Sequence, residues 1–144
     1  MGSYVDELRA MIRVRGWTVQ CVEDDQRPYA YTIGLHDRGL PELLVTGLSP
    51  ERAARLLNDV AAAAVEGRAL ETGAHIAVGS GPLLEIVEVE HPDAHMSFAV
   101  ALGGPDLRAL QLVWADDRGR WPWASGWGDG RRRQPVLGLR GQNA

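Results

Sequence analysis

Between Ser49 and Gly67 the chain reads SPERAARLLNDVAAAAVEG, and this stretch decides the fold class. Ser49 is a favoured residue for the N-terminal cap of a helix, Pro50 fits the first turn, and Glu51 complements the positive end of the helix dipole. Apolar residues then recur at helical spacing, at Ala53, Leu56, Leu57, Val60, Ala61 and Ala64. The sequence therefore predicts an amphipathic helix with one buried face, which ends at Gly67.

Short segments with β-type composition lie on both sides of this helix. They cover residues 17–21, 29–33 and 43–46 before it, and 83–89 and 110–114 after it. Helical spacing predicts a second helix over residues 3–15 and a short third one over 93–102. We therefore expect an α+β fold, in which a mostly antiparallel sheet packs with two to three helices. In the first of the strands, Cys21 alternates with Trp17 and Val19, so its side chain is predicted to be buried with theirs.

Length and charge limit the classes of function. A chain of 144 residues normally forms a single domain, so we take residues 1–144 as one domain with a loose tail at 138–144. The net charge of -4 argues against non-specific binding to nucleic acid or membranes, and we interpret the run Arg131–Arg133 as a solvated loop. No apolar run approaches the length of about 20 residues that spans a bilayer.

Two residue types restrict the chemistry further. All 15 cationic side chains are arginine, which excludes mechanisms based on a lysine Schiff base or a P-loop lysine. The single cysteine cannot form an internal disulfide, which favours a cytoplasmic protein. The composition also resembles that of proteins from GC-rich bacteria.

Tryptophan is concentrated in one segment. Four of the five tryptophans, Trp114, Trp121, Trp123 and Trp127, lie close together beside Asp116. The turn sequence at 116–119 predicts a hairpin in which Trp114 and Trp121 face one another across two strands. Such a cluster is either a small aromatic core that holds a loop or the wall of a ligand pocket.

A second candidate segment runs from Tyr29 to Asp37. Gly34 permits close approach of the backbone, and Thr32 places a hydroxyl beside Tyr31. His36 is a candidate acid–base group because neighbouring carboxylates tune the proton affinity of an imidazole. The alternative is that His36 is simply exposed in a loop.

Metal and cofactor motifs are weak or absent in the sequence. His91 and His95 are four residues apart, but Pro92 places the start of a helix between them. There is no Cx2C, HExxH, GxGxxG or Walker pattern. We therefore expect no metal and no cofactor.

The motifs together resemble the domain-of-unknown-function 4262 family. The resemblance rests on residues 31–35, 41–43 and 110–114, on Asp116, Gly119, Pro122 and Trp123, and on Gln134 and Pro135, so it extends from about residue 16 to residue 137. It implies a small bacterial, often actinobacterial, single-domain protein, and it implies no established activity.

The chain departs from the family pattern at three positions. Leu40 stands where members commonly have a histidine before the Pro-Glu pair, Ala115 replaces the proline of a Trp-Pro-Asp motif, and Ala124 replaces an acidic residue. The histidine that the family commonly has at the first position is therefore missing, unless His36 supplies an imidazole from the same loop.

Polar and aromatic residues of both segments suggest an enzyme. We expect a small hydrolase that acts on an activated carbonyl, such as an ester, lactone or cyclic imide, of a peptide or natural product. Asp116 or His36 is the expected general base, and Tyr31 and Thr32 are expected to donate hydrogen bonds to the oxyanion. The expected substrate-binding residues are Glu42, Gln111, Trp114, Trp121, Trp123 and Gln134.

Two alternatives belong to other classes of function. One is a non-catalytic module that binds a small molecule or peptide through the tryptophan pocket. The other is a protein–protein interaction domain, for example a homodimer, with Trp121, Trp123 and Trp127 in the contact.

Overall fold

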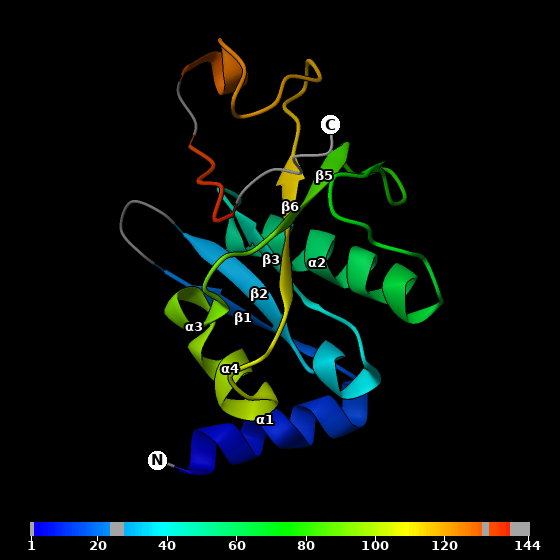
Figure 1. The fold of residues 1–144 in the computed structure, drawn as a ribbon, viewed down its shortest axis with the longest axis vertical. Helices are drawn as coiled ribbons and strands as arrows, with labels where there is room; N and C mark the ends of the chain where they lie inside the picture. The colour runs from blue at the N-terminus through cyan, green and yellow to red at the C-terminus, as the bar shows by residue number, and fades with distance from the viewer. Residues whose placement is uncertain (1, 24–27, 131–132, 139–144) are drawn as a thin grey trace.

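In the part of the chain that the structure describes, six strands form one sheet, which helices cover on both faces (Figure 1). The computed structural model describes residues 2–23, 28–130 and 133–138. The strand order is β1 (Thr18–Val22), β2 (Tyr29–Ile33), β3 (Glu42–Thr46), β6 (Ala109–Trp114), β5 (Leu84–Glu88) and β4 (His75–Ile76). Among these described strands, β3 and β6 pair in parallel, and the other neighbours are antiparallel. The predicted α+β class with a mostly antiparallel sheet is confirmed.

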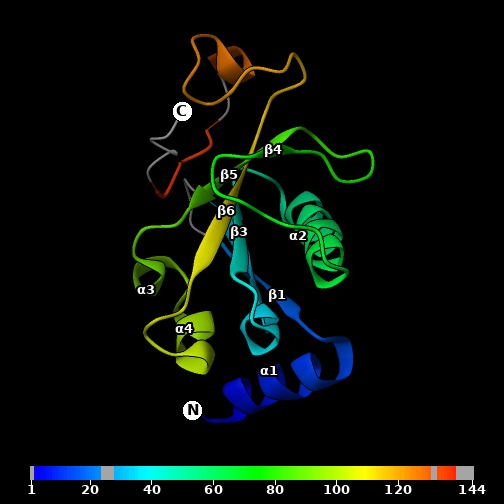
Figure 2. The same cartoon turned by 45° about the vertical axis from the view of Figure 1, so that its right-hand side comes forward.

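The helices form two layers around the sheet, which Figure 2 shows from the side. Helix α2 (Pro50–Val65) packs against β1, β2 and β3 on one face. On the other face, α1 (Gly2–Arg15) contacts β1 and α4 (Ser97–Gly103) contacts β2, while α3 (Pro92–His95) lies next to α4. The helices predicted at 3–15 and from Ser49 are thus confirmed, and Ser49 accepts a hydrogen bond from the backbone of Arg52 as a capping residue does.

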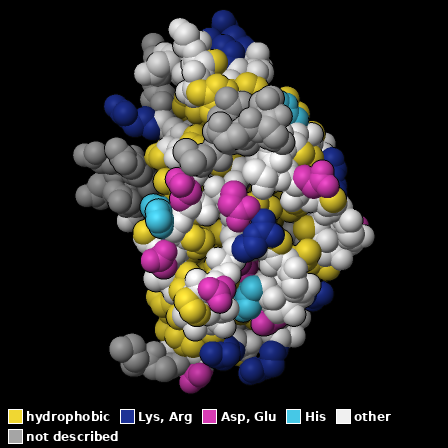
Figure 3. Space-filling view, in the orientation of Figure 1, with side chains coloured by type: hydrophobic (Ala, Val, Ile, Leu, Met, Phe, Trp, Pro, Cys, Tyr) yellow, Lys and Arg dark blue, Asp and Glu magenta, His cyan; other side chains and the backbone are white. Residues whose placement is uncertain are grey.

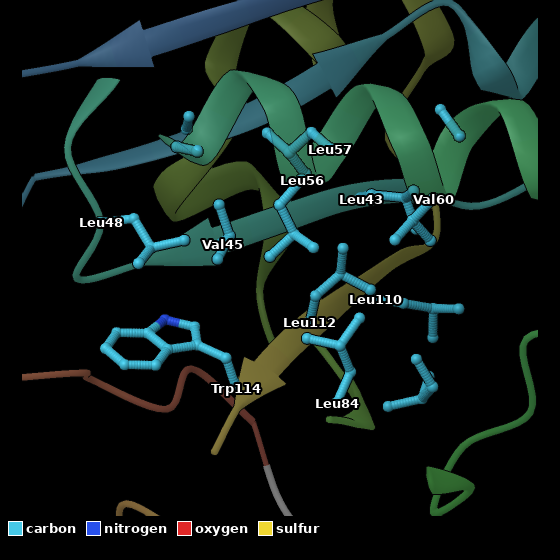
Figure 4. Close-up of a cluster of buried hydrophobic side chains, with 14 of the residues drawn as sticks. Leu43, Val45, Leu48, Leu56, Leu57, Val60, Leu84, Leu110, Leu112 and Trp114 are labelled. Atoms are coloured by element: carbon cyan, nitrogen blue, oxygen red, sulfur yellow. The ribbon is translucent and has the colours of Figure 1, made fainter. Parts of the chain in front are cut away.

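Alternation along the strands divides the apolar side chains between two cores. In β3, Leu43 and Val45 face α2, whereas Leu44 faces the opposite core with Tyr31. Figure 4 shows the core under α2, where leucines of β3, β5 and β6 meet the buried face of the helix and Trp114 closes one end. Strands buried on both faces explain why Glu42–Thr46 and Ala109–Trp114 are buried throughout.

Several expectations were wrong in detail. The helix predicted at 93–102 is broken at Met96, whose φ of -124° is not helical, so α3 and α4 are separate. Cys21 is exposed, because β1 is the edge strand of the sheet and has a neighbour on only one side. The short strand β4 was not predicted, since two residues carry no periodicity.

In the part of the chain that the structure describes, no helix is both long and apolar enough to cross a membrane. A loose tail was predicted at 138–144, of which residues 139–144 lie outside the described residues. Arg131 and Arg132, interpreted as part of a solvated loop, lie outside them too.

Candidate functional site

One buried carboxylate organises the turn that follows β2. Glu42, at the start of β3, is fully buried and accepts hydrogen bonds from the Thr32 hydroxyl (2.7 Å) and from three backbone N–H groups, those of Gly34 (2.8 Å), Leu35 (3.2 Å) and His36 (3.1 Å). The Nδ1 atom of His36 lies 2.6 Å from the same carboxylate. Glu42 therefore caps the short 3-10 helix η1 (Leu35–Arg38) and orients an imidazole at the same time.

The glycine of this segment is required by its surroundings. Gly34 has a φ of 123°, which side chains with a Cβ rarely adopt. A Cβ at this position would lie 3.0 Å from the carbonyl oxygen of Gly16, from Cγ2 of Ile12 and from Cα of Trp17. The chain can turn toward Glu42 here only because position 34 has no side chain.

The imidazole of His36 is held on three sides. Nδ1 contacts Glu42, Nε2 lies 3.3 Å from Oδ1 of Asp37, and the ring packs on Gly103, where a Cβ would come within 3.1 Å of Cγ. The hydrogen bond to Glu42 raises the pKa of His36 above its ordinary value of 6.5, although burial acts in the opposite direction. The side chain is 18% exposed, so the ring is ordered and still reaches solvent.

A pocket of about 120 Å³ opens beside this imidazole. It is lined by Arg9 and Arg13 of α1, by His36 and Asp37 of η1, and by Leu102 of α4. In Figure 3, arginine side chains gather at the α1 end of the molecule, with a histidine and carboxylates next to them. The pocket therefore combines an oriented imidazole with two guanidinium groups.

Sequence reasoning missed Arg9 and Arg13. They are four residues apart and thus on one face of α1, but the apolar spacing of the helix indicates only its buried face. The pocket depends on where α1 packs, and no pattern within α1 encodes that position.

The two hydroxyls that were expected to bind an oxyanion are engaged elsewhere. Thr32 donates to Glu42 and accepts from the backbone N–H of Leu43 (2.8 Å). Tyr31 is buried on the opposite side of β2, where its hydroxyl accepts from the backbone N–H of Phe98 (3.3 Å) and burial raises its pKa. Neither residue lines the pocket beside His36, so the expected oxyanion role has no support in the geometry.

Asp116, the other expected general base, is an anchor for the tryptophan-rich loop. Its carboxylate accepts four hydrogen bonds, from the backbone of Arg118, Arg120 and Gly128 and from Nε of Arg120. Partial burial raises the pKa of Asp116, but the hydrogen bonds from Gly128, Arg120 and Arg118 outweigh this and lower it to about 2. A carboxylate with so low a pKa and with both oxygens occupied is a poor base for water at neutral pH.

His36 and Asp116 lie at opposite ends of the sheet. Glu42 pairs with Ala109 at the start of β6, whereas Asp116 follows the end of that strand at Trp114. At about 3.3 Å per residue, the strand alone separates the two ends by about 16 Å. The two segments therefore do not form one site, contrary to the expectation.

The predicted tryptophan hairpin is also wrong. Residues 120–123 form no strand, and Trp114 packs against Trp127 (ring centroids 5.1 Å apart) instead of Trp121. Trp114 is buried and donates its indole N–H to the carbonyl of Thr46 (2.9 Å). Trp127 is buried as well, so it is not part of an exposed contact surface.

Trp121 and Trp123 form a separate, partly exposed stack. Their ring centroids are 5.6 Å apart and their planes differ by 8°. The ring centroid of His75 lies 4.8 Å from that of Trp121. The Nε2 atom of His75 lies 2.7 Å from the buried carboxylate of Glu85. This stack therefore lies beside β4, at the edge of the sheet.

The two glutamines expected to bind substrate instead hold the C-terminal segment. The Gln134 side chain exchanges two hydrogen bonds with the backbone of Trp114, both 2.9 Å. Gln111 donates to the carbonyl of Pro135 (2.8 Å) and accepts from the N–H of Leu137 (2.7 Å). Both amides replace backbone partners inside the protein, which is a structural role.

No group of His, Cys, Asp and Glu suited to a metal ion occurs among the described residues. His91 precedes α3 with a φ of 56°, and His95 ends that helix.

The comparison with protein families agrees with the motifs in the sequence. A family model described as a domain of unknown function, DUF4262, matches residues 11–128 of the 144. The chain belongs to the DUF4262 family. The match ends before Gln134 and Pro135, on which the resemblance also rested. No curated protein and no solved structure matches the chain.

In this DUF4262 protein, the residues of the first motif form one interaction. Thr32, Gly34 and Leu35 all donate to the carboxylate of Glu42. Leu40 packs against the core under α2, while the imidazole of His36 contacts the carboxylate of Glu42.

Proposed function

We propose that the protein is a small hydrolase in which His36 is the general base. The substrate would be an activated carbonyl, such as an ester, lactone or cyclic imide, and the reaction would need no cofactor. The observation that carries this proposal is the 2.6 Å contact between His36 Nδ1 and Glu42, beside a pocket that His36 itself lines.

Glu42 supports the base in two ways. A buried carboxylate on Nδ1 fixes the tautomer in which Nε2 is free to accept a proton, and it stabilises the imidazolium once the proton has been transferred. The Oδ1 atom of Asp37, 3.3 Å from Nε2, belongs to a side chain that is 67% exposed. Substrate or water can displace such a side chain at small cost.

The size and charge of the pocket fit a small reacting group. A volume of about 120 Å³ accommodates the carbonyl group and its neighbours, while the remainder of a peptide or natural product stays outside. The guanidinium groups of Arg9 and Arg13 provide the positive charge that stabilises an oxyanion in place of Tyr31 and Thr32.

The reaction would follow ordinary hydrolysis. A water oxygen attacks the carbonyl carbon while Nε2 of His36 takes one of its protons. The tetrahedral intermediate then collapses, the bond to the leaving oxygen or nitrogen breaks, and the imidazolium returns the proton to the leaving group. The products are a carboxylic acid and an alcohol or amide.

The test is hydrolysis of a panel of aryl esters, lactones and cyclic imides by the wild type, His36→Gln and His91→Gln. Loss of a general base lowers kcat/KM by about 100-fold or more, so we expect this loss in His36→Gln and none in His91→Gln, whose imidazole is exposed elsewhere. The rate should rise with pH through an apparent pKa above 6.5, because the base is active only when neutral. A full rate in His36→Gln, or no turnover of any member of the panel, would overturn the proposal.

A further inference from the structure

We propose that a second pocket, between α2 and the end of β6, binds a free α-amino acid with an apolar side chain. This pocket has a volume of about 220 Å³, against about 120 Å³ for the one beside His36. Its walls include Arg52, Arg55, Leu56 and Asp59 of α2, and Trp114 and Asp117 at the end of β6. The inference is independent of the proposed hydrolase.

The charges around this pocket suit a zwitterion. Arg52 and Arg55 are three residues apart, and both are exposed on α2 at the rim of the pocket. Asp59 and Asp117 are exposed there too. Within residues 2–23, 28–130 and 133–138, none of these four side chains forms an ion pair. Two cations and two anions at one opening are thus available to a ligand that carries both charges.

Part of the pocket wall is apolar, because Leu56 and Trp114 line it. Leu56 and Trp114 are 6% and 3% exposed, and both belong to the core under α2 (Figure 4). An aliphatic ligand side chain against this wall would itself be removed from water. The indole N–H of Trp114 is bound to Thr46, so this wall offers its ring and no donor.

The volume of the pocket limits the size of the ligand that it can bind. Pockets for drug-sized ligands begin near about 300 Å³, so about 220 Å³ is suited to a smaller metabolite. Guanidinium groups bind carboxylates in a paired, directional way, and carboxylates bind an ammonium group. An amino acid such as leucine has groups that match each part of the pocket. Its carboxylate would bind Arg52 and Arg55, and its ammonium group would bind Asp59 and Asp117. Its side chain would lie over Leu56 and Trp114.

The test is isothermal titration calorimetry with L-leucine and three analogues that each lack one feature. N-acetyl-L-leucine and 4-methylpentanoate lack the ammonium group, and L-leucinamide lacks the carboxylate. We expect leucine to bind and each analogue to bind at least tenfold more weakly. Equal affinity for N-acetyl-L-leucine, or no heat with leucine at about 10 mM, a concentration that detects millimolar binding, would overturn the proposal.

Variants locate the binding to this pocket. Leucine affinity should fall at least tenfold in a double variant that combines Arg52→Gln with Arg55→Gln. The single variant Asp59→Asn should lower it by at least as much. Glu51→Gln, on the same helix but outside the pocket, and Arg118→Gln, which removes one exposed guanidinium elsewhere, should bind as the wild type does. All these side chains are exposed, so folding is preserved, which circular dichroism checks. Wild-type affinity in the double variant would place leucine elsewhere and contradict the assignment.

Discussion

The Oε2 atom of Glu42 lies 2.6 Å from Nδ1 of His36, and the same oxygen accepts the backbone N–H groups of Gly34 and His36. One carboxylate oxygen therefore fixes both the course of the chain after β2 and the orientation of the imidazole. Stability and the proposed activity are coupled at this residue, because no substitution of Glu42 can alter one role alone.

Glu42→Gln should lower the free energy of unfolding by about 3 kcal/mol, since an amide leaves buried donors without an acceptor and removes a buried charge. Denaturant unfolding measures this loss. Glu90→Gln changes an exposed glutamate in the same way and should be neutral. Equal stability of both variants would show that the capping bonds contribute little.

The pH dependence of stability should reveal His36. Because folding raises the pKa of His36 above 6.5, protonation contributes stability that is fully present below 6.5 and is lost as pH rises through the folded pKa. Unfolding measured from roughly pH 6 to 9 should show this decline in the wild type. His36→Gln should lack that component, and an identical decline in both proteins would assign it to another group.

Gly103→Ala should disturb the imidazole without removing it. The new Cβ would meet Cδ1 of Leu107 and lie 3.1 Å from Cγ of His36. Overpacking of this kind costs about 1–3 kcal/mol, and the displaced ring should also lower kcat more than it raises KM. Ala101→Ser, at an exposed position of α4, is the matched control.

Asp116→Asn should loosen the tryptophan-rich loop and leave hydrolysis intact. The carboxylate of Asp116 binds Arg118, Arg120 and Gly128, and its pKa of about 2 lies below the ordinary value of 3.8. Its contribution to stability is therefore present above 3.8 and lost as pH falls toward about 2. Thermal unfolding should show a lower Tm for the variant at neutral pH and a smaller difference in acid. Abolished turnover in a folded variant would instead return Asp116 to the role of base.

Gln134→Ala should release the C-terminal segment from Trp114. The substitution removes both hydrogen bonds between the Gln134 side chain and the buried backbone of Trp114, at a cost of about 1–3 kcal/mol. Hydrogen exchange at the Trp114 amide should accelerate, while Arg133→Ala, at the exposed neighbouring position, should not change it.

The sequence was informative wherever a local pattern carries the information. Helix α2 follows from its cap, its proline and its apolar spacing, and five of the strands follow from short β-type segments bounded by turns. The motif residues Thr32, Gly34 and Glu42 were also identified, although their common role as a cap was not. A sequence can therefore identify the residues that take part in one interaction without showing how they are arranged in space.

The tertiary structure decided everything that depends on distant segments. The parallel pairing of β3 with β6 places Glu42 beside Ala109 and so leaves Asp116 at the other end of the sheet. The packing of α1 and α4 brings Arg9, Arg13 and Leu102 to His36. The second pocket forms where residues of α2 and of the end of β6 come together. Local spacing encodes which face of an element is apolar, but which elements share a pocket follows from the lowest free energy of the whole packed chain.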